Sequence, residues 1–434
     1  MRELHAWMED RHVGVFYQST DEEIRFVYDR GVNTPISLSL PLQGGWTRRS
    51  PARFLDNLLP DDANTREAMR RAVHANEADS FSLLDGADAT GGLVFTSNPE
   101  PPDPSRMPAV LASDADIAYR IISMRNSPGS WWQSDQRVRF SLAGNQPKFS
   151  LLRIGDHWAW SNAANPSSHI IKPAPNGDEG DRIHSIRDAD IIETTSMKLA
   201  ELCGMTIPHS GLIVFDGEPA YIVERFDRYT RDDGIIGRIH TEDMLQALGL
   251  PPKDKYHVKA KMILSCLHEA DPSDRLSYEW IAQLALNTAI SNADAHAKNY
   301  SLLLRPEGVS LSPMYDVLTT TYWPKVDRSL PMSIGGVRGA ANLTPYHWRR
   351  FALDNHLDEE RVVTIARTMS GRILDHMEEA YQDLSAGMRD VLINELRKAN
   401  QNMEPIRERR DWDFAAMLEE TDRNDHDRND HGRS

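Results

Sequence analysis

Short segments with alternating or β-branched apolar residues dominate the first hundred residues of the chain. A hydrophobic period of two predicts strands that place every second side chain in a core. These segments are residues 13–16, 24–28 and 36–40. Two helix-like stretches follow, at about 52–59 and 63–73, and Gly91-Gly92 then leads into an apolar segment that predicts a strand returning to the sheet. The pattern predicts a β-rich N-terminal subdomain over residues 1–100.

A proline-dense, polar stretch at 98–105 predicts a linker after this subdomain. The next region mixes strands with one helix, Ile191–Cys203, which stops at Gly204, a residue that suits the position after a helix end. A mainly helical region follows, and the charged end of the chain carries a tandem repeat without apolar residues, which predicts disorder. The three predicted regions after the first are 106–235, 236–404 and 405–434.

Asp294, Asn299 and Asp316 form the most informative pattern of the chain. Asn299 lies five residues after Asp294, the interval of the D-x-x-x-x-N catalytic loop in protein kinases. Asn299 and Asp316 offer oxygen ligands to Mg²⁺, which leaves Asp294 to orient or deprotonate an acceptor hydroxyl. The alternative is a turn at 292–294 and an ordinary loop acid, since Asp and Asn are common in turns.

The segments on either side of this pattern agree with the catalytic interpretation. Residues 280–285 predict a buried helix that feeds the loop. Residues 300–304 and 309–311 predict two strands joined by a turn. Such a hairpin would carry Asp316 back beside Asn299.

A glycine-containing loop and two lysines predict the phosphate side of the site. Residues 139–152 predict a strand, a polar loop and a second strand. Gly144 lets backbone N–H groups approach phosphate oxygens, and Lys148 adds a positive charge. Lys172 ends a short apolar strand at 168–173, as the strand lysine of kinases does. Each feature also has an ordinary interpretation, a strand pair without a ligand and a solvated lysine.

Two further features continue the same order along the chain. Glu193, on the predicted helix, either pairs with Lys172 or is a surface carboxylate. Residues 211–215 and 220–228, joined by an Asp-Gly turn, predict a β-hairpin whose second strand ends in charged residues with Phe226 among them. In a kinase this is where the hinge holds adenine. Glycine loop, strand lysine, hinge and the Asp–Asn–Asp pattern thus follow one another in kinase order.

Together these motifs resemble the HipA-type serine/threonine kinases, which are toxins of bacterial HipBA toxin–antitoxin systems. The resemblance runs from about residue 10 to about residue 400. The segments that carry it are Ile36–Leu42, Phe54–Pro60, Phe140–Lys148, His169–Lys172, Val223–Arg228, Asn292–Asn299 and Pro313–Val317. The family implies an α+β, protein-kinase-like fold of two lobes with a β-rich N-terminal subdomain and a mainly helical C-lobe.

The resemblance also implies a role for each matching site residue. Asp294 looks like the catalytic aspartate, and Asn299 and Asp316 look like the Mg²⁺ ligands. Ser141 falls on the serine that the family autophosphorylates, so it is expected to be a self-inactivating switch. The residues expected to contact ATP, with the hinge pair Glu224 and Phe226 among them, are Ala143, Gly144, Asn145, Gln146, Lys148, Lys172, Glu224, Phe226, His296 and Lys298.

By the same resemblance, the chain is expected to phosphorylate an aminoacyl-tRNA synthetase and to arrest growth. A small helix-turn-helix antitoxin of the HipB type would neutralise it and supply the DNA binding. Two other classes stay open. One is a catalytically silent co-repressor bound to its antitoxin, which would have no need of Lys172 and the Asp–Asn–Asp residues together. The other is a Mg²⁺-dependent phosphohydrolase or nuclease, in which the glycine loop and hinge would have no purpose.

Composition argues against some classes of protein and some cellular locations. A length of 434 residues predicts two or more cores, and a formal net charge of −16 argues against broad nucleic-acid binding. The mean hydropathy is −0.53, there is no apolar run of 18 residues, and acids occur within the first ten. Neither a membrane span nor a signal peptide is therefore indicated, and a cytoplasmic location is expected. Cys203 and Cys266 are expected to be separate buried thiols.

Overall fold

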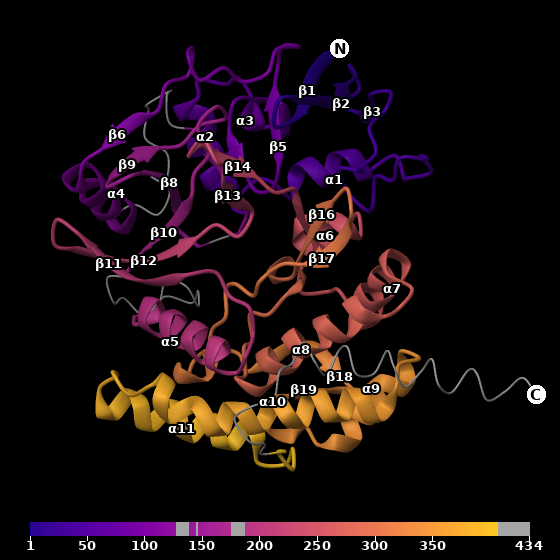
Figure 1. Ribbon diagram of the computed structural model, residues 1–434, viewed down its shortest axis with the longest axis vertical. Coiled ribbons are helices and arrows are strands. Elements are labelled where there is room, and N and C mark those ends of the chain that lie inside the picture. The colour runs from indigo at the N-terminus through magenta and orange to yellow at the C-terminus, as the bar shows by residue number, and fades with distance from the viewer. Residues whose placement is uncertain (127–138, 145, 175–186, 407–434) are drawn as a thin grey trace, which may run out of the picture. The chain divides into compact units, whose positions relative to one another are not determined.

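The computed structural model describes residues 1–126, 139–144, 146–174 and 187–406, and the predicted disordered tail lies outside them from residue 407 onward. The chain forms two compact units, and each unit combines three separate stretches of sequence (Figure 1). The first unit consists of Met1–Thr194, Pro208–Val258 and Ala297–Ser312. The second consists of Thr195–Ile207, Lys259–His296 and the chain from Pro313.

A four-stranded antiparallel sheet in the order β3-β2-β1-β5 opens the first unit. Its strands are β1 (Arg2–Met8), β2 (Arg11–Gln18), β3 (Ile24–Tyr28) and β5 (Leu93–Thr96). The predicted strands at 13–16 and 24–28 and the returning strand are confirmed, whereas β1 has no counterpart among the predictions. Four consecutive residues of β1 are buried. It therefore lacks the one-sided alternation that identifies a half-buried strand.

The predicted strand at 36–40 is wrong, because this segment forms turns. Its alternation of serine with apolar residues is typical of a strand, but its polar groups form hydrogen bonds with a side chain and not with a neighbouring strand. The N–H of Leu38 donates to Glu242 Oε1 at 2.8 Å, and Ser37 Oγ donates to Glu242 Oε2 at 2.5 Å. These partners lie more than 200 residues further along the chain. A buried carboxyl group, and not a neighbouring strand, satisfies this backbone.

A six-stranded antiparallel sheet in the order β11-β12-β10-β8-β9-β6 follows. Its strands are β6 (Val110–Ala112), β8 (Phe149–Ile154), β9 (His157–Trp160), β10 (His169–Pro173), β11 (Ser210–Phe215) and β12 (Glu218–Glu224). Helix α4 (Asp114–Asn126) packs against β6, β10, β11 and β12 (Figure 1). The predicted β11–β12 hairpin is confirmed. Its turn residues Asp216 and Gly217 have φ of 43° and 87°, as a two-residue hairpin turn of this kind requires.

The two sheets of the first unit share one hydrophobic core. Phe16 and Phe95 from the four-stranded sheet belong to the same cluster of buried side chains as Phe149 and Ile171 from the six-stranded sheet. The proline-dense stretch at 98–105 therefore joins two sheets that are packed on common side chains.

Shorter elements complete the first unit. The helices are α1 (Ser50–Asp56), α2 (Ala63–Ala72), α3 (Ser80–Leu84) and α6 (Met244–Ala247), with the 3-10 turns η2 (Pro252–Asp254) and η3 (Ala297–Asn299). The strands are the parallel pair β4 (Asp88–Ala89) and β7 (Phe140–Ser141), the pair β13 (Arg228–Thr230) and β14 (Ile236–Arg238), and the sheet of β15 (Thr241–Asp243), β16 (Ser301–Arg305) and β17 (Gly308–Leu311). Helices α1 and α2 and the hairpin β16–β17 confirm their predictions.

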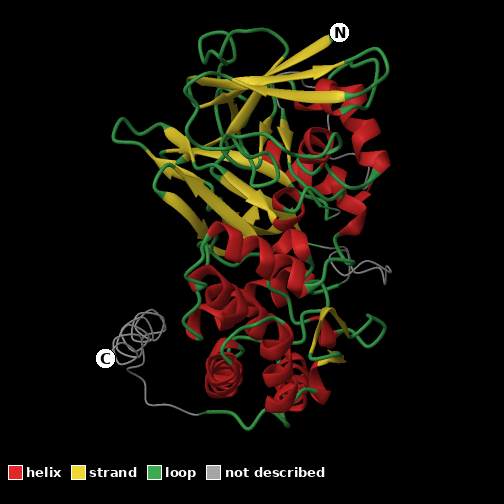
Figure 2. Ribbon diagram, turned by 90° about the vertical axis from the view of Figure 1, so that its right-hand side faces the viewer, coloured by secondary structure: helices red, strands yellow, loops and turns green. Residues whose placement is uncertain are grey.

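The second unit is mainly helical in its described part, as predicted (Figure 2). Its elements are α7 (Ala260–Ala270), α8 (Arg275–Ala289), η4 (Thr320–Tyr322), β18 (Ser329–Ile334), β19 (Val337–Gly339), η5 (Ala340–Asn342), α9 (Pro345–Asp354), α10 (Glu359–Ala380) and α11 (Ala386–Asn400). Helix α10 packs against α8, α9 and α11, and α8 is buried along nearly its whole length.

The boundary between the units falls inside helix α5 (Ala189–Leu202), between Thr194 and Thr195. This helix confirms the predicted one, and Gly204 beyond its end has a left-handed φ of 83°, which favours glycine. None of the described helices is long and apolar enough to cross a membrane.

Candidate active site

Lys172 and Glu193 form a buried ion pair in the first unit. Strands β10 and β12 align Ile171 with Ile222 and Lys172 with Tyr221. Because successive side chains of a strand face opposite sides, Ile171 enters the core and Lys172 faces away from it. Lys172 Nζ lies 2.5 Å from Glu193 Oε1, and the two side chains are only 5% and 2% exposed. Of the two interpretations of Glu193, the structure adopts the pair.

The loop between β7 and β8 combines a left-handed glycine with a lysine folded over it. Gly144 has a φ of 99°, and Lys148 Nζ donates to the carbonyl of Ala143 at 3.0 Å. A Cβ at position 144 would lie 3.1 Å from that ammonium group, so glycine leaves it room. The flanking strands do not pair with each other, because β7 pairs with β4 and β8 lies in the six-stranded sheet. Asn145 lies outside the described residues, and Gln146 is partly buried.

Ser141, the predicted self-phosphorylation site, is completely buried. Its Oγ donates to the carbonyl of Leu58 at 2.7 Å, and its residue pairs with Ala89 in the parallel β4–β7 pair. A hydroxyl without solvent exposure, whose proton is already donated, is not available as a phosphate acceptor in this conformation. Its modification stays a prediction, and it requires this part of the chain to move.

Glu224 and Phe226 lie at the end of β12, where the hinge was predicted. The backbone N–H of Glu224 donates to the carbonyl of His209 at 2.8 Å, and its side chain is about half exposed. Phe226 is partly buried, whereas its neighbours Arg225 and Asp227 are buried. The residues between and after the two hinge positions therefore anchor the segment inside the protein.

Arg225 and Asp227 belong to a buried charge cluster that the sequence analysis missed. Its members are Asp88, Arg225, Asp227, Arg228 and Arg238, with N–O distances between 2.7 and 3.4 Å. Burial acts to raise the pKa of Asp88, yet the three arginines hold it below its usual value. Burial lowers the pKa of Arg228 to about 10. No local signal reveals the cluster, because Asp88 lies 137 residues or more before its arginine partners.

In the second unit, one side chain anchors the backbone of both predicted aspartates. The N–H of Asp294 donates to Asn292 Oδ1 at 3.0 Å. Asn292 Nδ2 donates to Asn287 Oδ1 at 2.9 Å and to the carbonyl of Asp316 at 3.3 Å. The turn at 292–294 that sequence analysis offered as the alternative is therefore present, and it fixes both carboxyl-bearing residues. Asp316 adopts a left-handed φ of 51°, a conformation that aspartate tolerates better than most residues.

Lys298, predicted to contact ATP, uses its ammonium group inside the first unit. Its Nζ donates to Asp243 Oδ2 at 2.7 Å, to Asn57 Oδ1 at 2.9 Å and to the carbonyl of Asn57 at 3.1 Å. An ammonium group has three N–H donors, so these contacts match its capacity. The side chain of Lys298 therefore anchors its own loop here. His296 and Asn299 are buried to 6% and 9% exposure, and their ligand contacts stay predictions.

The hairpin β16–β17 brings the end of β17 back beside the start of β16. Leu302 pairs with Leu311, and the N–H of Ser312 donates to the carbonyl of Ser301 at 2.9 Å. The chain that leads to Asp316 thus departs from beside Ser301, two residues after Asn299. The pairing is as predicted. Asn299 and Asp316 belong to different units, and their joint role as metal ligands stays a prediction.

The chemistry of these two side chains suits magnesium. An amide oxygen and a carboxylate are ligand types that Mg²⁺ accepts, with phosphate and water oxygens filling the rest of its octahedron. In the part of the chain that the structure describes, no group of three or more His, Cys, Asp or Glu side chains is arranged to hold a metal ion.

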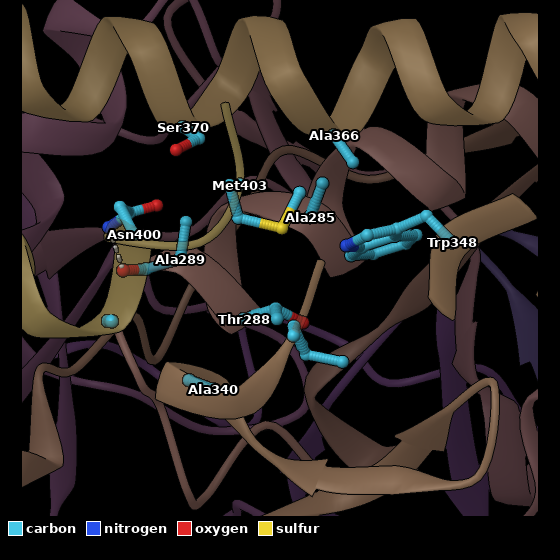
Figure 3. A pocket seen from close by; sticks show the side chains of 11 residues that line it. Ala285, Thr288, Ala289, Ala340, Trp348, Ala366, Ser370, Asn400 and Met403 are labelled. Atoms are coloured by element: carbon cyan, nitrogen blue, oxygen red, sulfur yellow. Dashed lines mark hydrogen bonds between the residues drawn. The ribbon is translucent and has the colours of Figure 1, made fainter. Parts of the chain in front are cut away.

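A pocket in the second unit involves none of these residues (Figure 3). Five alanines line it together with Leu343, Trp348 and Met403, and Thr288, Ser370 and Asn400 supply polar groups. An apolar lining without a charged side chain does not suit a nucleotide phosphate.

Comparison with known proteins gives matches along most of the chain. Residues 4–96 match the HipA N-terminal domain, and residues 140–377 match the HipA-like C-terminal domain. The protein Y4mE of Sinorhizobium fredii is 31% identical over 370 residues, which cover 81% of this chain and 85% of that protein. The serine/threonine-protein kinase toxin HipA of Shewanella oneidensis is 26% identical over 318 residues, 69% of this chain and 70% of that protein.

The fold also has a solved counterpart. A chain from the complex of HipA, HipB and operator DNA of Shewanella oneidensis superposes with a TM-score of 0.76 at 22% identity, covering 92% of this chain and 96% of that chain. The α+β, kinase-like fold expected from the sequence is thereby confirmed. The C-terminal domain match spans both the Lys172–Glu193 pair and the anchored aspartates. With both domain models matched in tandem, this chain belongs to the HipA family of kinase toxins.

Proposed function

We propose that this protein is an ATP- and Mg²⁺-dependent serine/threonine protein kinase that acts as a growth-arresting toxin. The buried Lys172–Glu193 pair is the observation that carries the proposal. Removing two charges from water costs several kcal/mol, and their attraction offsets this only with good geometry. Such a pair is therefore a poor device for stability alone. In protein kinases the corresponding pair must be in place for the lysine to bind the nucleotide phosphates.

The other site residues divide the work of phosphotransfer between them. Lys172 and the loop around Gly144 bind the phosphates of ATP, and Glu224 and Phe226 hold the adenine. Asp294 orients the acceptor hydroxyl and takes its proton, and its backbone anchoring by Asn292 supports this role because a preorganised base needs no rearrangement during the reaction.

Asn299 and Asp316 are the residues that would hold the magnesium ion. When bound, the ion neutralises negative charge on the phosphates. The hydrogen bond from Asn292 Nδ2 to the carbonyl of Asp316 supports this assignment, because it fixes the backbone of the residue that carries the carboxylate.

The proposed partners follow from the relatives. The HipA counterpart was solved with HipB and operator DNA, which supports a HipB-like helix-turn-helix antitoxin as the partner of this chain. The formal net charge of −16 favours DNA contact through that antitoxin and not through the kinase itself. The proposed protein substrate is an aminoacyl-tRNA synthetase, and phosphorylation of Ser141 would end the activity.

Incubation of the purified protein with radiolabelled ATP and Mg²⁺ tests the proposal. A kinase transfers label to protein, a silent co-repressor transfers none, and a phosphohydrolase releases free phosphate without labelling protein. Asp294→Asn is the matched control, because it keeps the side-chain volume and removes the base. Absence of labelled protein, with or without free phosphate, would overturn the kinase assignment.

A further inference from the structure

Residues Asn57–Asp61, which directly follow helix α1, contact three elements of the proposed active site. The carbonyl of Leu58 accepts the hydroxyl of Ser141. The N–H of Asp61 donates to the carbonyl of Gly144. Asn57 accepts two hydrogen bonds from Lys298. All of these residues belong to the first unit. One short segment therefore joins the glycine loop, the predicted switch serine and the loop that carries Asn299.

The segment contacts the glycine loop through hydrogen bonds that are made mostly by backbone atoms. Ser141 Oγ lies 2.7 Å from the carbonyl of Leu58, and the N–H of Asp61 lies 3.4 Å from the carbonyl of Gly144. Pro60 and Gly144 form a parallel bridge between the two stretches of chain. The side chain of Leu59 is completely buried in the core of the unit. The segment, together with the partner strand β4, is therefore one of the elements that bury Ser141.

The two ends of the segment are held by polar side chains. At one end, Asn57 Oδ1 and the carbonyl of Asn57 accept from Lys298 Nζ at 2.9 and 3.1 Å. At the other end, Asp61 Oδ2 lies 2.9 Å from Lys255 Nζ, and both of these side chains are nearly nine-tenths buried. The carbonyl of Lys255 accepts the N–H of Ala297 at 3.2 Å. Both ends therefore lead to the stretch Ala297–Asn299.

We infer that Asn57–Asp61 is a positioning segment that holds the glycine loop and the Asn299 loop in one arrangement, and that it covers Ser141 until it opens. The effect of this segment on phosphotransfer rests on the kinase activity proposed above. Anchors at both ends mean that loss of either one lowers the free energy of opening. The N-terminal subdomain then contributes to phosphotransfer by supplying this segment and without touching the substrate.

The opening step controls self-modification. When the segment lifts, the oxygen of Ser141 can bond to the γ-phosphorus of ATP while the bond from that phosphorus to the β,γ-bridging oxygen breaks and ADP leaves. The hydroxyl proton passes to a base. A phosphate on Ser141 cannot return beneath the carbonyl of Leu58, because two oxygens bearing negative charge or partial charge would face each other without a proton between them. Opening thus becomes permanent once the serine is modified.

Thiol labelling at position 141 tests the segment without any need for ATP. Ser141→Cys is placed in a Cys266→Ser background, which leaves the buried Cys203 as the other thiol. The rate of iodoacetamide labelling then reports how often position 141 is exposed. Asp61→Ala should raise this rate about tenfold, because it removes one charge-assisted hydrogen bond. Asn57→Ala should raise it at least as much, because it removes the bond from Lys298 and the two bonds that Asn57 Nδ2 donates to the carbonyls of Arg53 and Leu250. Glu218→Ala, which removes a partly buried ion pair to Arg125 and does not touch the segment, should leave the rate unchanged.

A second measurement uses the natural Ser141 and intact mass after addition of Mg²⁺–ATP. Asp61→Ala should accumulate phosphate on Ser141 several-fold faster than wild type. If the segment only supported the fold, the variant should accumulate this phosphate more slowly than wild type. Asp61→Asn keeps the side-chain volume and serves as a second variant in case Asp61→Ala does not fold. It should also raise the rate of phosphate accumulation on Ser141. Labelling rates equal to wild type in Asp61→Ala, Asp61→Asn and Asn57→Ala would overturn the positioning role whatever the kinase assay gives. Raised labelling with no phosphate on Ser141 in any variant would keep the segment as a cover and remove its link to self-modification.

Discussion

Replacing Glu193 with alanine should cost far more stability than the loss of a surface charge. Its carboxylate lies 2.5 Å from Lys172 Nζ, and both side chains are at most 5% exposed. Removing one partner of such a pair costs about 3–5 kcal/mol, because the remaining charge keeps its desolvation penalty and loses the attraction that offset it. The exposed pair Arg349–Glu360 gives the matched control, Glu360→Ala, with an expected cost of about 1 kcal/mol or less.

The double variant Lys172→Met/Glu193→Leu separates the stability of the pair from its role in phosphotransfer. Two apolar side chains remove both charges, and such a replacement of a buried pair is often neutral or stabilising. Urea unfolding followed by tryptophan fluorescence should therefore show a loss in Glu193→Ala that the double variant largely recovers. Transfer of labelled phosphate should be absent from both proteins.

Two results would refute this reasoning. If Glu193→Ala unfolds at the same urea concentration as wild type, the pair is not desolvated as its burial indicates. If the double variant transfers phosphate to protein, the pair is a structural contact and the observation that carries the proposed function is lost.

Three further predictions concern single residues. Asp294→Asn should lower phosphotransfer by roughly 10²–10⁴-fold without changing the unfolding midpoint, and a wild-type rate would show that the catalytic loop is misassigned. Asp316→Ala should weaken Mg²⁺–ATP binding more than Asn299→Ala, because a carboxylate carries charge and an amide does not. Nucleotide titration at limiting Mg²⁺ measures this, and unchanged affinity in both variants would remove the metal role. Burial raises the pKa of Glu242 from 4.5 to about 8, so the folded protein keeps a proton that the unfolded chain releases. Relative to Glu242→Gln, stability should therefore fall by about 1.4 kcal/mol per pH unit between roughly pH 5 and 8, and parallel stability curves for the two proteins would contradict this.

Local patterns predicted the elements whose partners lie nearby in the sequence. The β11–β12 and β16–β17 hairpins, helix α5 with Gly204 at its end, and the buried helix α8 all follow from periodicity and turn residues within one short window. The pair Lys172–Glu193 was foreseen as one of two alternatives. Spacing could not choose between them, because only the packing of α5 decides whether Glu193 is buried.

Features that depend on distant partners escaped prediction. Residues 36–40 have the alternation of a strand, but Glu242 binds their polar groups from the far side of the sequence and turns replace the strand. The sequence around Asp88 gives no sign of its role, because only the fold places three arginines beside it. Asn292 was noticed only as part of a turn, although its amide side chain holds the backbone of both Asp294 and Asp316. Such tertiary contacts override local preference.

The interleaved order of the two units has a consequence for synthesis of the protein. Strand β15 finds its partner β16 only after the stretch Lys259–His296, which belongs to the other unit, has been translated. Domains usually fold as units while the ribosome adds residues from the N-terminus. Here the unit that contains Lys172 cannot close until Ser312 has been made. A chain abandoned before that point lacks a strand of its own sheet, so an interrupted translation product should lack the phosphotransfer activity proposed above.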